Sequence, residues 1–227
     1  MILLVGSLLS CRYKSGSGEI VSRESNVGNF TAVTVGGGFE VEIRKGSTQK
    51  LKVEADDNII DDIETRVEGG NLKIKLKDDF NLHNAHMKIF ITAPSITSIQ
   101  SSASAEVAVI DDLSAEETLR FKATSGSSIK ATIDAPAAEA DASSGAEINL
   151  GGRTRNFNAE ASSGASVNAG KLLSENTTAQ TSSGATLDVH ASVSLDAKAS
   201  SGGSIKYRGA ASVIKKESSG GNIEKRD

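Results

Sequence analysis

Residues 96–227 consist of short segments in which apolar and polar residues alternate, and these segments repeat. One unit is clear from Ala142 to Leu150, where the tripeptide Ser-Ser-Gly separates two alternating segments. Strict alternation places every second side chain on the same face, which predicts strands with one buried face. Ser-Ser-Gly between two such strands predicts a tight corner, because glycine adopts positive φ without steric cost.

The corners recur at nearly constant spacing along the chain. Their glycines are Gly126, Gly145, Gly164, Gly184, Gly202 and Gly220. The longest interval between successive glycines is the one from Gly164 to Gly184. A period near 20 with alternation inside it is typical of a β-solenoid, in which each repeat forms one rung that stacks on the next. The predicted fold class is therefore all-β, a parallel β-helix or β-solenoid with rungs of about 19 residues, preceded by a strand-rich N-terminal region.

Alignment of the corners predicts which side chains stack. One apolar residue per unit is expected in a buried stack: Ile148, Val167, Leu187, Ile205 and Ile223. The next position is polar and is expected to form an exposed column: Lys130, Asn149, Asn168, Asp188, Lys206 and Glu224. In this column Asn149 and Asn168 would form an amide ladder. Lys206 would lie between Asp188 and Glu224.

The corners and the last unit carry further predictions. The corner serines are expected to bond the backbone and satisfy donors that no ladder reaches. In the last unit Lys215 and Glu217 replace inward alanines. A terminal repeat needs such polar residues, because its outer edge faces water.

Residues 19–95 contain strands but no period. Residues 30–35 and 39–44 alternate clearly, Gly69-Gly70 predicts a hairpin, and Pro94 ends the last strand of this part. The predicted organisation has four parts: a lipoprotein signal peptide with its lipobox (1–11), a flexible tether (12–18), the strand-rich N-terminal part (19–95) and the Ser-Ser-Gly repeat solenoid (96–227).

Residues 1–11 form an apolar run that is too short to span a bilayer and ends at the only cysteine, Cys11. Leu8-Leu9-Ser10-Cys11 resembles the lipobox of bacterial lipoproteins, in which the cysteine is lipidated and becomes the mature N-terminus. The resemblance implies an exported protein anchored through Cys11, in the outer membrane or at the cell surface. No basic residue precedes the run, which a start codon upstream of Met1 would explain. The alternative is an ordinary N-terminal strand with a chance cysteine.

A second resemblance covers residues 19–227. It rests on the alternating segments 30–35 and 39–43, followed by Ile91-Thr92-Ala93-Pro94 and the Ser-Ser-Gly repeats. This order of motifs resembles the head GIN domain family of putative auto-transporter adhesins. The resemblance implies a secreted or surface-attached all-β protein and supplies no catalytic residues.

Three groups of residues are candidates for chemical sites. His83 and His86 have H-x-x-H spacing, with Asp78, Asp79 or Glu64 as a third ligand, but spacing alone favours a polar loop. The acidic cluster Asp56-Asp57 with Asp61-Asp62 is interpreted as a solvated face. The position two residues before each Ser-Ser-Gly corner differs between units, which excludes a regular calcium column; its residues are Lys122, Asp141, Glu160, Gln180, Lys198 and Lys216.

Asp141 and Glu160 carry the enzyme alternative, because the repeat places them one rung apart. Two carboxylates about 5–10 Å apart can cleave glycosides. Aromatic residues that could form sugar platforms make up only 4% of the chain, and no groove-forming loop is evident. Two surface carboxylates beside Lys122 are therefore the preferred interpretation.

The predicted function is a cell-surface or periplasmic lipoprotein, a non-catalytic adhesin-like or scaffolding β-solenoid without metal or cofactor. Its expected partners are the membrane, through the lipid, and a surface glycan or protein. The net charge of −4 without a basic stripe argues against nucleic acid. The alternative is a carbohydrate-active β-helix enzyme or glycan-binding module. A deep groove with convergent charges would favour the alternative, and flat Ser/Thr/Ala faces would favour the adhesin.

Overall fold

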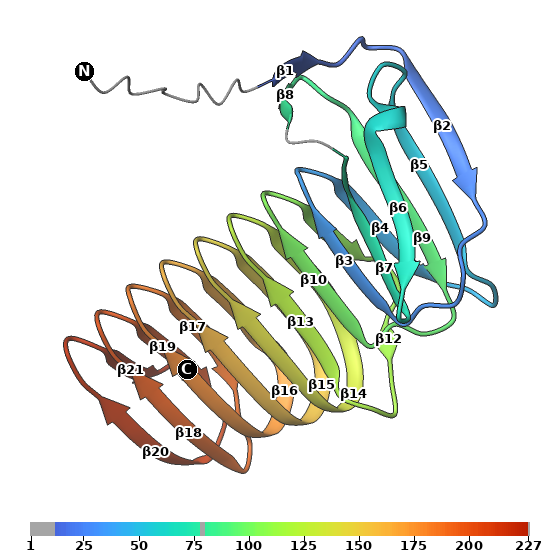
Figure 1. The fold of residues 1–227 in the computed structure, drawn as a ribbon. Helices are drawn as coiled ribbons and strands as arrows, with labels where there is room; N and C mark the ends of the chain where they lie inside the picture. Colours follow the sequence, from blue (N-terminus) through green and yellow to red (C-terminus); the bar gives the residue numbers. More distant parts are fainter. Residues whose placement is uncertain (1–11, 78–79, 227) are drawn as a thin grey trace, which may run out of the picture.

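The computed structural model describes residues 12–77 and 80–226, which are almost entirely β-structure (Figure 1). The N-terminal part contains β1 (Arg12–Ser15), β2 (Ile20–Ser25), β3 (Ala32–Gly36), β4 (Glu40–Lys45), β5 (Lys50–Asp56), η1, a 3-10 helix (Ile60–Asp62), β6 (Ile63–Glu68), β7 (Asn71–Leu76), β8 (Phe80–His83) and β9 (Met87–Ala93). The repeat region contains β10 (Ser98–Ser102), β11 (Glu106–Val109), β12 (Leu113–Ser114), β13 (Leu119–Ala123), β14 (Ser128–Ala142), β15 (Glu147–Ala161), β16 (Ser166–Thr181), β17 (Thr186–His190), β18 (Ser194–Ala199), β19 (Ser204–Arg208), β20 (Ser212–Glu217) and β21 (Asn222–Lys225).

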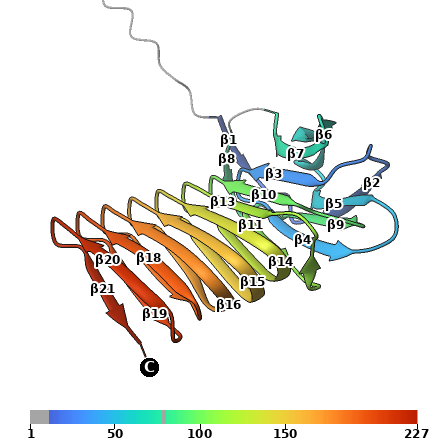
Figure 2. The same ribbon diagram turned by 90° about the horizontal axis from the view of Figure 1, so that it is seen from below.

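The repeat region is a β-solenoid built from two parallel sheets (Figures 1 and 2). Sheet A contains β10, β13, the C-terminal halves of β14, β15 and β16, then β18 and β20. Sheet B contains β11, the N-terminal halves of β14, β15 and β16, then β17, β19 and β21. The predicted fold class, a β-solenoid with a strand-rich start, is confirmed.

The rungs stack in the predicted register. Ile148 pairs with Ile129 on one side and Val167 on the other, and the series continues through sheet B. The five apolar residues of the predicted stack are at most 5% exposed. The neighbouring polar column is in register from Lys130 to Glu224 and is exposed or half-buried throughout. A slip of one residue would exchange these two columns, so the hydrophobic pattern specifies the register.

The corners share one unusual backbone conformation. The six corner glycines have φ between 69° and 76°, the positive value that the sequence predicts. The serine before each glycine also has positive φ, between 46° and 54°, which the sequence did not predict. Two successive residues with positive φ form a type I′ turn. The corner without glycine makes the same turn, with φ of 49° at Ala103 and 61° at Ser104.

The backbone itself satisfies the donors of the corners. Ala146 N donates across its turn to Ser143 O (3.2 Å), and Gly145 N donates to Ser163 O of the next rung (3.1 Å). The same two bonds recur at Gly164 and Ala165. At these two corners the stacked turns continue the ladder, so the donors do not need the serine side chains. The predicted serine bond occurs at the Gly126 corner, where Thr124 N donates to Ser127 Oγ at 3.1 Å.

The N-terminal part joins both sheets and covers their first edge. β3 and β4 stack in parallel on β10 and β11, so the two sheets begin before residue 96. β7 and β9 extend them by one strand each. Antiparallel β6 lies beside β7, antiparallel β5 lies beside β9, and β2 lies antiparallel beside β5. The bulkiest buried side chains, including Phe30 and Phe39, gather at this end.

Residues 12–18, expected to be a flexible tether, are bonded to the N-terminal part. β1 pairs in parallel with β8. The amides of Gly18 and His86 each donate to the Asp56 carboxylate at 2.7 Å. Asp56 is 1% exposed, so its interpretation as part of a solvated acidic face is wrong. The reason is that a buried carboxylate here supplies acceptors that the neighbouring strands do not.

The last rung ends the stack with charged side chains, as the sequence predicts. Lys215 and Glu217 pair in register with Ala197 and Ala199, the inward alanines of the preceding rung. Lys215 Nζ donates to Ile223 O at 3.0 Å and lies 4.9 Å from the Tyr207 ring centre. Ile223 N donates to the Glu217 carboxylate at 2.5 Å. These bonds occupy backbone groups at the exposed end of the solenoid.

The predicted signal peptide and lipobox, including Cys11, lie outside the described residues. Within residues 12–77 and 80–226, no helix has the length and apolar character needed to cross a bilayer.

Candidate functional site

A groove of about 980 Å³ lies on the outer side of sheet B. We call it groove B. The segment 108–110 at the end of β11 forms one wall, and the polar lining residues are Lys130, Thr132, Asn149, Asn168, Lys171, Asp188 and Arg208. Of these, Lys130, Asn149, Asn168 and Asp188 belong to the polar column that the sequence predicts. The groove itself, and the contributions of Lys171 and Arg208, were not predicted.

The floor of groove B contains the predicted amide ladder. Asn168 Nδ2 donates to Asn149 Oδ1 at 3.0 Å and to Glu147 Oε1 at 2.9 Å. This ladder uses the amide nitrogen of Asn168 and the amide oxygen of Asn149. In the described part of the chain, the remaining nitrogen of Asn149 and oxygen of Asn168 form no hydrogen bond. A donor group and an acceptor therefore remain for a ligand.

A β-bulge shapes the groove between β15 and β16. Asn149 pairs with Asn168, but Gly151 pairs with Lys171, so β16 has one more residue over this stretch. The bulge falls in the longest interval between successive corner glycines, the one from Gly164 to Gly184. Bulges change where nearby side chains point and are common beside functional sites. The longer interval was the sequence signal that could have indicated this site.

Gly170 makes room for an ion pair inside the groove. A Cβ at this position would lie 2.1 Å from Arg208 Nη1 and 2.8 Å from Asp188 Oδ1. Arg208 instead lies over this glycine and bonds Asp188 at 2.6 Å. The sequence predicted Lys206 between Asp188 and Glu224. Lys206 does pair with Glu224 at 3.8 Å, but the ion pair of Asp188 is with Arg208.

Two cations of groove B have no ion-pair partner. Among residues 12–77 and 80–226, neither Lys130 nor Lys171 lies within ion-pairing distance of a carboxylate. Both side chains are exposed. Among its lining residues, with the Arg208–Asp188 pair counted as neutral, groove B has an excess of two positive charges in a chain whose net charge is −4.

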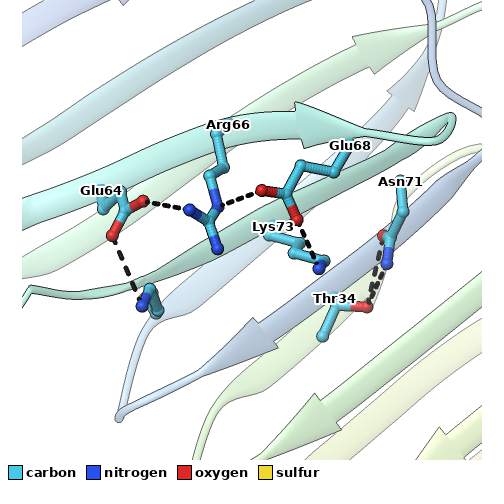
Figure 3. A network of polar contacts seen from close by, with 7 residues as sticks. Thr34, Glu64, Arg66, Glu68, Asn71 and Lys73 are labelled. Atoms are coloured by element: carbon cyan, nitrogen blue, oxygen red, sulfur yellow. Dashed lines mark hydrogen bonds and ion pairs between the residues drawn. The ribbon is translucent and has the colours of Figure 1, made fainter.

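The charges of the β6–β7 hairpin are neutralised by one another (Figure 3). Arg66 lies between Glu64 and Glu68, at 3.2 and 3.1 Å, and Lys73 bonds Glu68 at 2.7 Å. The hydrogen bond from Lys73 lowers the pKa of Glu68 below its ordinary value. This network fixes the β6–β7 hairpin and has no free charge for a ligand.

Sheet A has a shallower charged surface that contains the predicted carboxylate pair. A hollow of about 470 Å³ is lined by Asp141, Glu160, Lys198 and Lys216, among others. Asp141 and Glu160 lie side by side in register, as the sequence predicts. Asp141 also accepts a bond from Lys122 Nζ at 2.8 Å, and this bond raises the pKa of Lys122. One carboxylate of the pair is thus already engaged in an ion pair.

The two histidines do not assemble a metal site in the described structure. His83 and His86 are both exposed, and the backbone amide of His86 bonds Asp56. Asp78 and Asp79 lie outside the described residues. Among residues 12–77 and 80–226, no three His, Cys, Asp or Glu side chains are placed to hold a metal ion.

Comparisons with known proteins identify similar sequences and folds. A family model described as putative auto-transporter adhesin, head GIN domain, matches residues 29–211. A crystal structure of a putative adhesin from Bacteroides fragilis superposes with a TM-score of 0.85 at 19% identity, covering 94% of this chain and 100% of that one. A putative lipid binding protein from Parabacteroides distasonis has a TM-score of 0.75 at 19% identity, covering 95% and 100%.

A putative adhesin from Parabacteroides merdae has a TM-score of 0.74 at 12% identity, covering 96% of this chain and 100% of that one. At these identities the structural matches show a shared fold. Among curated proteins, no match to the chain was found.

Proposed function

The chain belongs to the head GIN domain family of putative auto-transporter adhesins, and on this basis we propose that it is an exported, non-catalytic adhesin-like lipoprotein. A lipid on Cys11 holds it in the outer membrane or at the cell surface. The solenoid then presents its outer surfaces to a glycan or protein partner.

The observation that carries the proposal is the position of the two ends. β1, next to Cys11 in sequence, lies at one end of the molecule, and β20 and β21 lie at the other (Figure 1). From β10 to β20 sheet A has six strand spacings, which at about 4.8 Å each give about 29 Å. An anchor at Cys11 would therefore hold the solenoid away from the membrane, as a contact protein requires.

The residues 12–18 support this geometry further. A flexible tether would let the solenoid lie in any orientation. Here β1 pairs with β8, and Asp56 bonds Gly18. An anchored Cys11 would consequently connect directly to a rigid body that begins at Arg12, so the membrane would set the position of the solenoid.

Lipid attachment is tested by replacing Cys11. We expect the wild-type protein to incorporate a labelled fatty acid and to sediment with membranes, and the Cys11→Ala variant to lose both properties. Ser10→Ala is the matched control, because it keeps a small residue before the cysteine and should stay anchored. Membrane retention of Cys11→Ala together with an unlabelled wild-type protein would refute the anchor.

The adhesin-like role is tested separately, on whole cells. Cells that display the wild-type chain should bind a mucin-coated surface more than cells that produce Cys11→Ala, while total protein remains equal. Equal binding by both cell types would contradict the adhesin-like role even if the lipid is present.

A glycan-binding module is the second candidate, and groove B favours it. The groove offers polar groups and cations without ion-pair partners, whereas Asp141 of the carboxylate pair on sheet A is engaged with Lys122.

A further inference from the structure

Groove B combines three features that point to one class of ligand. The first is its charge. Lys130 and Lys171 are exposed and without carboxylate partners in the described residues, although acidic residues outnumber basic ones by 29 to 25 in the chain. Elsewhere on the surface, cations such as Lys122 and Lys73 are paired. Complementary charge concentrates oppositely charged ligands in a cleft, so groove B favours an anion.

The second feature is the spacing of its cations along the solenoid. Lys130 is on β14 and Lys171 is on β16, with β15 between these two strands. Arg208 is on β19, and β17 lies between β16 and β19. Two strand spacings correspond to about 10 Å. Counted along the solenoid axis, the three cations therefore recur at intervals of two strands. Lys171 is in register with Gly151 and Thr132, so its position along the strand is two residues beyond that of Lys130. This staggered spacing suits an extended chain that carries anions at intervals rather than a single compact anion.

The third feature is the floor between the cations. Asn149 and Asn168 present a free amide donor group and a free acceptor, and the half-buried Gly151 adds no side chain to the floor. Hydroxyl groups both donate and accept, so a sugar matches this floor. The wall includes Ile110, which is 45% exposed and offers a contact for the apolar face of a sugar ring.

We propose that groove B binds an acidic oligosaccharide that lies along the solenoid axis. Lys130 and Lys171 contact its carboxylate or sulfate groups, and the Asn149–Asn168 ladder bonds its hydroxyls. The Arg208–Asp188 pair closes the C-terminal end of the groove and positions Arg208 toward the same staggered series of cations. This inference names the ligand class for the binding role proposed above and rests on that role.

The proposal is tested by titration calorimetry on the full chain. The acidic probes are tetragalacturonate and a sulfated hexasaccharide prepared from heparin. The comparison probes are methyl-esterified tetragalacturonate, which has no charge, and a hexaglutamate peptide. We expect at least one acidic sugar to bind, and its affinity should fall as the salt concentration rises. The neutral ester should bind at least tenfold more weakly than tetragalacturonate.

Variants locate the binding in groove B. The double variant Lys130→Ala/Lys171→Ala should bind the acidic sugar at least tenfold more weakly than the wild-type protein. The Lys171→Arg variant should retain binding because it keeps the charge. Lys216→Ala is the matched control, since Lys216 is an exposed lysine on sheet A. Far-ultraviolet circular dichroism and thermal unfolding must show that all variants remain folded.

Several outcomes would overturn the proposal. These are no binding of either acidic sugar, equal binding of the neutral ester, or full affinity in the double variant. Tighter binding of hexaglutamate than of both sugars would assign the groove to an acidic peptide. Because calorimetry needs no membrane, failure here leaves the Cys11 and cell-binding tests unaffected, and the two failures can be distinguished.

Discussion

At the scale of single residues, the glycines with positive φ differ in what surrounds them. A Cβ at Gly164 would meet no atom within 4 Å, so substitution there carries only the conformational cost. A Cβ at Gly152 would lie 2.1 Å from the carbonyl oxygen of Ile133 in the neighbouring rung. Positive φ alone therefore does not determine how strongly each glycine is required.

We expect Gly164→Ala to lower the free energy of unfolding by about 1–2 kcal/mol, the cost of a left-handed residue. Gly152→Ala should cost about 3 kcal/mol or more, because backbone displacement adds an overpacking cost of about 1–3 kcal/mol. Urea unfolding measures both. Gly164→Asn is the control and should cost less than Gly164→Ala, since asparagine tolerates this conformation. Equal losses at the two glycines would show that the contact with Ile133 relaxes freely.

Asp56 gives a pH-dependent prediction at the same scale. The amide of His86, and then that of Gly18, bond the carboxylate and lower the pKa of Asp56 despite the opposing effect of burial. A carboxyl group whose pKa is lower in the folded state than in the unfolded state stabilises the fold. The full stabilisation is present at pH values above the unfolded-state pKa of about 3.9, and it is lost as the pH falls through the folded-state pKa.

We therefore expect Asp56→Asn to lower stability at pH 7 by about 1.5–3 kcal/mol, the typical contribution of a hydrogen bond to a charged group. The difference from wild type should shrink below about pH 4, as the unfolded and then the folded carboxyl group takes up its proton. Amide hydrogen exchange at Gly18 and His86 should accelerate in the variant. Asp57→Asn is the control, because Asp57 is exposed and its side chain bonds Ser17. Equal effects of both variants would contradict the role of the buried carboxylate.

At the scale of the elements, the last rung differs from those before it in a way that prevents further stacking. Inward alanines such as Ala197 and Ala199 allow the next rung to approach, whereas Lys215 and Glu217 occupy the end of the core and bond Ile223. Charged inward residues are a known protection of exposed strand edges.

Lys215→Ala/Glu217→Ala should therefore promote end-to-end association through β20 and β21. Sedimentation velocity should show a concentration-dependent increase in mass, with self-association at least tenfold tighter than in wild type. Lys216→Ala, whose side chain points outward on the same strand, should remain unchanged. A double variant that sediments like wild type at all concentrations would show that other features protect this edge.

The elements also show what could be predicted from sequence. Each repeat contains its own alternating strands and corner, so the sheet B stack around Ile148 and the Asn149–Asn168 ladder follow from aligning the copies. The serine conformation, by contrast, depends on stacked turns whose backbone bonds no single repeat shows. The burial of Asp56 does not follow from the local sequence, because its amide donors, Gly18 and His86, are distant from it in sequence on both sides.

The candidate site shows the same limit. Its column residues Lys130 and Asp188 lie at fixed distances after the corners and were placed correctly. Lys171 and Arg208 come from the segments of variable length, where repeat alignment cannot assign positions. The groove requires the one-residue bulge near Gly170, and only the longer interval from Gly164 to Gly184 indicated it.

At the scale of the whole molecule, the solenoid should behave as a series of interchangeable rungs. Each rung contacts mainly its two neighbours, so stability is close to a sum of rung and interface contributions. The segment 143–161 forms one complete period, from the start of one Ser-Ser-Gly corner to the residue before the next. Its removal joins Ala142 to Ser162 and leaves an intact corner. Because Ala142 pairs with Ala161, which precedes Ser162, β14 would then stack on β16 in register.

We expect the 143–161 deletion to fold cooperatively with reduced stability and a slightly smaller urea m-value, because less surface is buried. Deletion of residues 143–152 is the control: it removes a corner but only part of a rung, so the following strands lose their register and the protein should unfold or aggregate.

The complete deletion also places Lys130 one strand spacing from β16 instead of two, about 5 Å rather than about 10 Å. It should therefore stay folded yet bind the acidic tetrasaccharide more weakly than wild type. If both deletions unfold alike, the rungs are not interchangeable; if the folded deletion keeps full affinity, the spacing of cations in groove B does not select the ligand.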